Sequence, residues 1–166
     1  MNAKGRKAAA FLLAVTLTSS ASASLAASDS SFAGHYTTAS LSVQEQTAGN
    51  LLNSDRARYG LAPLVIDPEL CRIARIKSQD MRDNQYFAHT SPTYGDVRSM
   101  LRRFGYAFTT AGENIAHHAT VEKAQAAFLS SPGHRKNIMS GTYARVGLGA
   151  AVDAKGYVYL TQIFVR

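Results

Sequence analysis

The sequence predicts an α+β fold, a three-layer α-β-α sandwich with a central antiparallel sheet. Amphipathic helical patterns fill most of the chain, and two runs rich in Val, Tyr, Ile and Phe close it at residues 145–152 and 156–165. Helices that come first and paired strands that come last do not fit alternating βαβ units. The chain also lacks a Gly-rich phosphate loop, so nucleotide chemistry has no support.

The first residues predict an export signal. Three basic residues and no acidic one lie among residues 1–7, before the apolar run 8–17, and an A-x-A cleavage pattern follows at 21–23. Polar residues interrupt the run before it reaches the roughly 20 residues that cross a bilayer. We expect residues 1–27 to be a signal peptide, the mature protein to be secreted or associated with the cell envelope, and no transmembrane anchor to remain after cleavage.

The rest of the chain predicts one domain after a flexible leader. Residues 28–40 are rich in Ser, Thr, Ala and Gly without periodicity, which is typical of a leader. Residues 41–166 have the length that one hydrophobic core stabilises. Cys71 is the only cysteine, which excludes an internal disulfide, and we expect a monomer.

The charge of the chain argues against a nucleic-acid partner. Of the 18 basic residues, three belong to the signal peptide, which leaves 15 basic against 11 acidic residues. So small an excess favours loose attraction to anionic wall polymers or membranes, without the basic stripe of a nucleic-acid binder.

Two helices are predicted in the first half of the domain. Apolar residues share one side of residues 43–59, and Gly60 is placed to end that helix. Asp67 caps a second helix with Pro68 at its first position. Cys71 lies on the apolar face of this second helix, so we expect it to be a buried small hydrophobe.

Later segments complete the predicted fold. Residues 97–104 and 121–129 are shorter amphipathic helices, and a short strand is expected near 106–109. Residues 153–156 have turn chemistry between the two closing strands, which predicts a hairpin.

Three titratable residues stand beside turn-forming residues in separate segments. These residues are His89, Glu113 and His134. Spacing alone leaves the two histidines open as metal ligands, as an acid/base pair or as hydrogen-bonded loop residues. His117 and His118 are interpreted as residues of a solvated loop.

The order of short motifs resembles that of bacterial CAP domains, the superfamily of cysteine-rich secretory, antigen 5 and pathogenesis-related 1 proteins (SCP-like extracellular domains). In chain order the motifs are Asn53-Ser54-Asp55-Arg56, FAHTSP at 87–92, GENIA at 112–116, SPGHRKNI at 131–138 and YLTQIFVR at 159–166. The resemblance covers about residues 45–166. It implies an α-β-α sandwich with a concave site where His89, Glu113 and His134 meet, lined also by Asn114 and Ser131.

One departure from the family pattern concerns the chemistry of this site. Many eukaryotic members carry a second glutamate where this chain has Ser131. Two imidazoles and one carboxylate can still be three ligands of a divalent cation such as Zn²⁺, with a position left open. Acid/base work by a carboxylate pair loses support. Because Ser131 precedes Pro132, we interpret its hydroxyl as a helix cap rather than as a nucleophile activated by His134.

Three functions follow from the resemblance. The favoured one is a secreted binding module for an envelope, lipid or wall ligand, with a divalent ion as an option. The first alternative is a metal-assisted hydrolase of peptide or cell-wall polymer, with Glu113 and His134 as candidate catalytic residues. The second is a structural wall or spore component. The missing second glutamate shifts weight away from the enzyme.

Overall fold

The computed structural model describes residues 40–166. The predicted signal peptide, and the predicted leader up to residue 39, lie outside the described residues. The helices are α1 Val43–Arg58, α2 Pro68–Asp83, α3 Val97–Arg103, α4 Val121–Ser130 and α5 Pro132–Ile138. The strands are β1 Val65–Ile66, β2 Ala111–His118, β3 Arg145–Val152 and β4 Val158–Val165. Among the helices of this part of the chain, none is both long and apolar enough to cross a bilayer.

The strands form one sheet in the order β1-β3-β4-β2. β4 pairs antiparallel with both β2 and β3, and only the two-residue strand β1 runs parallel to its neighbour β3. The prediction of a central antiparallel sheet is therefore confirmed apart from β1. Strand β2, which carries Glu113, lies at the edge of the sheet.

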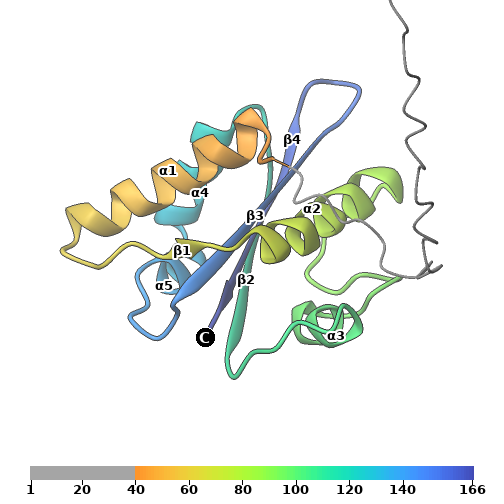
Figure 1. The fold of residues 1–166 in the computed structure, drawn as a ribbon. Helices are drawn as coiled ribbons and strands as arrows, with labels where there is room; N and C mark the ends of the chain where they lie inside the picture. The colour runs from red at the N-terminus through yellow and green to blue at the C-terminus, as the bar shows by residue number, and fades with distance from the viewer. Residues whose placement is uncertain (1–39) are drawn as a thin grey trace, which may run out of the picture. The chain divides into compact units, whose positions relative to one another are not determined.

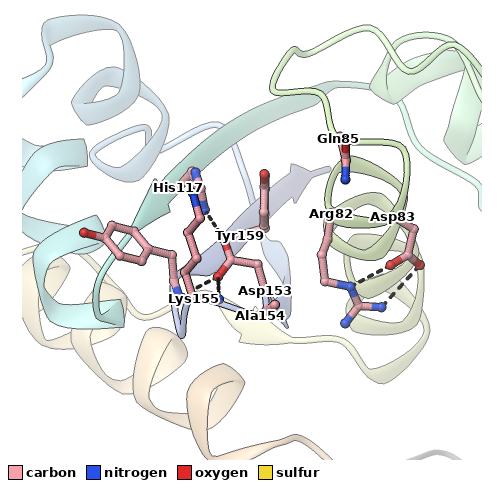
Figure 2. Close-up of a pocket in the computed structure, with 9 residues that line it drawn as sticks. Arg82, Asp83, Gln85, His117, Asp153, Ala154, Lys155 and Tyr159 are labelled. Carbon is pink, nitrogen blue, oxygen red and sulfur yellow. Dashed lines mark hydrogen bonds and ion pairs between the residues drawn. The ribbon is translucent and has the colours of Figure 1, made fainter.

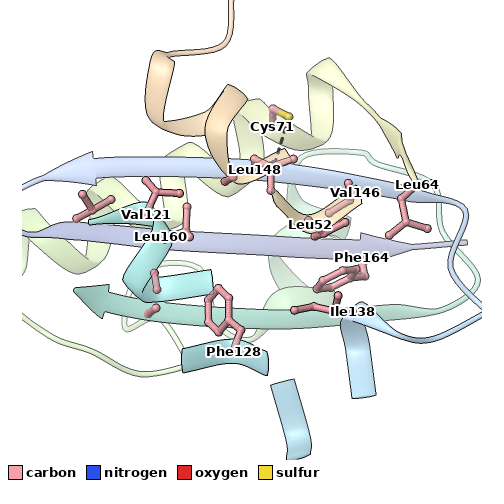
Figure 3. Close-up of a cluster of buried hydrophobic side chains, with 14 residues drawn as sticks. Leu52, Leu64, Cys71, Val121, Phe128, Ile138, Val146, Leu148, Leu160 and Phe164 are labelled. Atoms are coloured by element: carbon pink, nitrogen blue, oxygen red, sulfur yellow. Dashed lines mark hydrogen bonds between the residues drawn. The ribbon is translucent and has the colours of Figure 1, made fainter. Parts of the chain in front are cut away.

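Helices cover both faces of the sheet, which confirms the α-β-α sandwich (Figure 1). Side chains alternate between the faces of a strand, so β4 contributes to two cores. Leu160 and Phe164 pack with residues of α1, α4 and α5 in the larger core (Figure 3), whereas Ile163 and Val165 pack with residues of α2 and α3.

The helix boundaries follow the capping residues in the sequence. The Asp67 side chain accepts a hydrogen bond from the backbone N–H of Leu70 at the start of α2, as predicted. Gly60 adopts a positive φ of 69° directly after the cap of α1, also as predicted. Cys71 is buried in the core, and burial raises the pKa of its thiol to about 11, which confirms its structural character.

Two glycines of β3 let α2 lie directly on the sheet. A Cβ atom at Gly147 would overlap the backbone of Leu70, and one at Gly149 would overlap the backbone of Ala74. Glycine is therefore required at both positions. This close contact fixes the position of α2, and His89 lies in the segment that follows this helix.

The predicted strand at 106–109 is wrong. The strand in this part of the chain is β2, which contains the GENIA motif and both His117 and His118, predicted to lie in loops. Glycine, Glu and Asn are depleted in strands, so local propensity gives no signal here. Pairing of all eight residues of β2 with β4 decides the conformation instead.

Candidate functional site

The candidate site lies at edge strand β2, where successive side chains point to opposite faces of the sheet. Glu113 contacts the histidine segment that follows α2, whereas Asn114 contacts α5 on the other side. The sheet edge thus brings together segments from both helical layers.

His89 and Glu113 form a direct pair. Nδ1 of the imidazole lies 2.7 Å from Oε2 of the carboxylate. The His89 side chain is 57% exposed while that of Glu113 is 4% exposed, so the histidine faces solvent above a buried carboxylate. The hydrogen bond to Glu113 raises the pKa of His89, against a smaller opposing effect of burial. Oε1 of Glu113 is buried and has no hydrogen-bond partner.

His134 approaches from α5. Its ring centre lies 6.4 Å from that of His89 and 5.2 Å from that of Phe128, which it meets edge-on. Burial, and secondarily the charge of His89, lowers the pKa of His134. Within residues 40–166, no hydrogen bond or ion pair joins His134 to Glu113. The structure therefore brings the three predicted residues together: His89 and Glu113 are hydrogen-bonded, and the imidazole of His134 lies beside that of His89.

Lys77 of α2 holds the segment that carries His89. Its side chain is 1% exposed, and Nζ donates to the backbone carbonyls of Ala88 at 2.8 Å and His89 at 3.0 Å and to the hydroxyl of Tyr86 at 3.1 Å. Burial lowers the pKa of Lys77, and the negative charge of Glu113 opposes that effect. Lys77 was not among the site residues predicted from the sequence.

The chain matches a known protein family over most of its length. Residues 50–164, more than half of the chain, match the CAP family, described as the cysteine-rich secretory protein family. The chain belongs to the CAP family.

Two curated proteins of Bacillus subtilis (strain 168) are similar to this CAP chain. The uncharacterized protein YkwD is 46% identical over 111 residues, which are 66% of this chain and 43% of YkwD. The uncharacterized membrane protein YlbC is 38% identical over 122 residues, which are 70% of this chain and 33% of YlbC. The chain thus spans less than half the length of either relative.

Solved structures agree with the family assignment. An extracellular protein containing an SCP domain from Bacillus anthracis is 36% identical and superposes with a TM-score of 0.69, over 74% of this chain and 40% of that protein. An outer surface protein from Borrelia burgdorferi is 16% identical with a TM-score of 0.67, over 73% and 90% of the two chains, and shows the same fold.

Asp80 is a second anchor of the His89 segment in this CAP domain. Its carboxylate accepts hydrogen bonds from Ser91 at 2.6 Å, Thr93 at 3.0 Å, Asn84 at 2.8 Å and the hydroxyl of Tyr86. Burial alone would raise the pKa of Asp80, but these donors together lower it.

The sequence did contain a signal for the two anchors. On α2, Lys77 lies one helical turn from the buried residues Ile73 and Met81, and Asp80 lies two turns from Ile73. Charged residues are rarely buried unless they are paired. Two of them on the buried side of a helix therefore indicate bonded partners inside the protein.

Asn114 is completely buried, so it has a structural role and does not line an open cleft. Its Nδ2 donates to the backbone carbonyl of His134 and to Oε1 of Gln162, both at 3.1 Å. Asn137 of α5 donates to the carbonyl of Glu113 and to Oδ1 of Asn114. These amides fix α5, and with it His134, to edge strand β2.

Ser131 occupies the cap position of α5, with Pro132 at the first helical position, as predicted. Its side chain, however, makes no capping hydrogen bond, so that part of the prediction is wrong. In the described part of the chain, no hydrogen bond links the Ser131 hydroxyl to His134 either. The structure thus gives the hydroxyl no activated role.

His117 is not a free loop residue, because it pairs with the hairpin that joins β3 and β4. Its Nε2 lies 2.9 Å from Oδ2 of Asp153, and its ring stacks on that of Tyr159, with ring centres 3.9 Å apart and an interplanar angle of 15° (Figure 2). The register of the sheet places His117 and Tyr159 directly opposite each other.

The donor set at His89 and His134 fits a divalent cation only in part. Within residues 40–166, no group of three or more His, Cys, Asp or Glu side chains is arranged as a complete metal site. Two imidazoles that bind one Zn²⁺ at about 2 Å have ring centres about 5 Å apart, so the two rings, at 6.4 Å, would have to move closer together to share an ion. Because Nδ1 of His89 faces Glu113, the Nε2 atom is the one left for a metal.

Proposed function

We propose that this chain is an exported CAP domain that binds an envelope ligand at His89, Glu113 and His134, with a divalent cation such as Zn²⁺ as cofactor. Export is supported by the signal-like residues 1–27 and by the similar Bacillus anthracis protein, which is named as extracellular. The name of YlbC, a membrane protein, agrees with an envelope location.

The observation that carries this proposal is the unbonded oxygen of Glu113. Oε1 is buried without a partner, and buried polar atoms in folded proteins nearly always have one. A carboxylate oxygen in this situation favours a hydrogen-bond donor supplied from outside the chain, in addition to a cation at Nε2 of His89. The exposed side chain of His89 is bonded to the same carboxylate, so the solvent-facing part of the site is the imidazole.

The electrostatics favour metal binding at His134 and oppose it at His89, whose raised pKa favours the protonated imidazole. A metal ligand must be a neutral imidazole, and the lowered pKa of His134 keeps it neutral near pH 7. Glu113 holds Nδ1 of His89, which is the arrangement by which carboxylates orient metal-binding histidines. A cation held by His89 and His134 would supply Lewis acidity to a ligand bound there.

The hydrolase alternative receives no specific support. Glu113 would have to act as the base, yet its Oε2 is engaged by His89 and its side chain is buried. The second alternative, a structural wall or spore component, stays a prediction. Zinc titration distinguishes it from metal-dependent binding.

Calorimetric titration with zinc ions tests the proposal directly. The wild type is expected to bind one Zn²⁺, and the His89→Ala and His134→Ala variants to bind it at least about tenfold more weakly. His118→Ala, at the far end of the same strand, is the matched control and should keep wild-type affinity. Equal zinc uptake by the wild type and both site variants would remove the metal from the proposal.

A further inference from the structure

We propose that the pocket between the end of α2 and the β3–β4 hairpin is a second binding site, whose ligand is an uncharged saccharide. The pocket has a volume of about 710 Å³. It lies on β2 at His117, four residues from Glu113, which corresponds to roughly 13 Å along a strand. The inference is therefore independent of the function proposed for the His89–Glu113 pair.

Aromatic rings form one wall of this pocket (Figure 2). Tyr159 stacks on His117, and the ring of Tyr157 lies 5.6 Å from His117 at a tilt of 56°. Tyr157 is 44% exposed, and neighbouring Phe87, whose ring lies 6.5 Å from His117, is 52% exposed. The C–H faces of a pyranose ring can cover such surfaces and remove their apolar area from water.

The aromatic wall is held rigidly before any ligand binds. Asp153 accepts hydrogen bonds from the backbone N–H groups of Lys155 at 2.8 Å and Tyr157 at 2.9 Å, through Oδ1. Its other oxygen, Oδ2, pairs with His117. One carboxylate thus fixes the hairpin tip to β2, so binding would require little reordering of the wall.

Charge in the pocket favours an uncharged ligand. The lining contains Arg82 and Lys155 together with Asp83 and Asp153, which balance each other. Arg82 already pairs with Asp83, at 2.7 Å between Nε and Oδ1. An anion would be repelled by the two carboxylates, and a cation would be repelled by the two positively charged side chains. A hydroxyl group can donate a hydrogen bond to the carboxylates and accept one from Arg82 or Lys155. A polyhydroxylated, neutral ligand matches this surface.

Gln85 adds a polar side chain to the pocket at a position where α1 and α3 are followed by glycine. It is the only non-glycine residue with positive φ in residues 40–166, at 53°. The corresponding positions after α1 and α3 are glycines, Gly60 and Gly105, for which this conformation carries no steric cost. At the end of α2 the same turn, closed by a hydrogen bond from the N–H of Tyr86 to the carbonyl of Met81, is made by a glutamine, and this residue lines the pocket. A polar side chain thus stands at the wall where the other two turns have none.

Titration with tetra-N-acetylchitotetraose, an uncharged oligosaccharide, tests the inference by calorimetry and by NMR shifts. We expect millimolar or tighter binding, with inorganic phosphate not binding. Tyr157→Ala should weaken binding at least about tenfold, while Tyr59→Ala, at an exposed tyrosine that caps the end of α1, should not change it. No binding of the oligosaccharide, or binding unaffected by Tyr157→Ala, would overturn the inference.

Two further variants test the role of Gln85 and the independence of the two sites. Gln85→Gly should raise the melting temperature, because it relieves the positive φ, and at the same time lower saccharide affinity severalfold. Unchanged affinity in this variant would contradict a ligand role for the amide. His89→Ala should leave saccharide binding intact while zinc binding falls, so failure of this inference and failure of the proposed function are separable.

Discussion

Nζ of Lys77 donates a hydrogen bond to the backbone carbonyl of His89 at 3.0 Å, although the lysine is almost completely buried. The position of an exposed histidine is thus set by a charge inside the protein. Since α2 lies directly on Gly147 and Gly149, the chain of contacts runs from the sheet through the helix to the site.

Replacing Lys77 by methionine tests this coupling. Lys77→Met keeps the volume of the side chain but leaves the carbonyls of Ala88 and His89 without their donor, so the free energy of unfolding should fall by about 2 kcal/mol. Urea unfolding measures this loss, and Lys123→Met, at an exposed lysine of α4, is the control. If Lys77→Met were as stable as Lys123→Met, the hydrogen bonds of Lys77 to the two carbonyls would not contribute to stability.

The two histidines of the site should titrate in a fixed order. The bond to Glu113 raises the pKa of His89 and burial lowers that of His134, so His89 should lose its proton at the higher pH. NMR titration of the imidazole protons in metal-free protein measures both pKa values. With Glu113→Gln, the pKa of His89 should move back toward its ordinary value. The reverse order in the wild type would contradict the hydrogen-bonded pair.

This order has a consequence for stability. The raised pKa of His89 means that the folded state binds its proton more tightly than the unfolded chain, so this contribution is complete below about pH 6.5 and is lost as pH rises through the folded-state pKa. His134 acts in the opposite direction, because its folded-state pKa is lowered. In urea unfolding, the stability difference between the wild type and His89→Gln should therefore be larger at pH 6 than at pH 8.

Local pattern was sufficient to predict the helices. Asp67 and Pro68 mark the start of α2 and Gly60 the end of α1, because capping depends on a few neighbouring residues. The hairpin could be predicted for the same reason, from turn residues between two apolar strands. Each of these features depends only on residues that are close to it in the sequence.

Strand β2 and its contacts could not be predicted locally. His117 meets Asp153 across 36 positions, and Tyr159 only through the register of β2 against β4. The site was accessible from the sequence through family motifs, which identified His89, Glu113 and His134. The motifs gave no view of the sheet edge on which these residues meet, because that edge follows from the strand order.

The cap of α5 allows a comparison between two hydroxyl residues. Thr120 accepts a hydrogen bond from the backbone N–H of Lys123 at the start of α4, whereas Ser131 accepts none at the start of α5. Thr120→Ala should cost about 1 kcal/mol of unfolding free energy, and Ser131→Ala much less. Thermal denaturation of both variants checks this. An equal loss would mean that the Ser131 hydroxyl does cap the helix in solution.

The contact between α2 and β3 makes the strongest prediction about stability. Gly149→Ala places a methyl group where the backbone of Ala74 already lies, and backbone cannot move aside as a flexible side chain can. We expect a loss of at least about 3 kcal/mol, measured by urea unfolding. Gly141→Ala is the matched control, since a Cβ there meets no atom within 4 Å and the backbone φ is not positive. If both variants were equally stable, α2 would have to lie farther from the sheet than the structure places it, and the support of His89 by Lys77 would need another explanation.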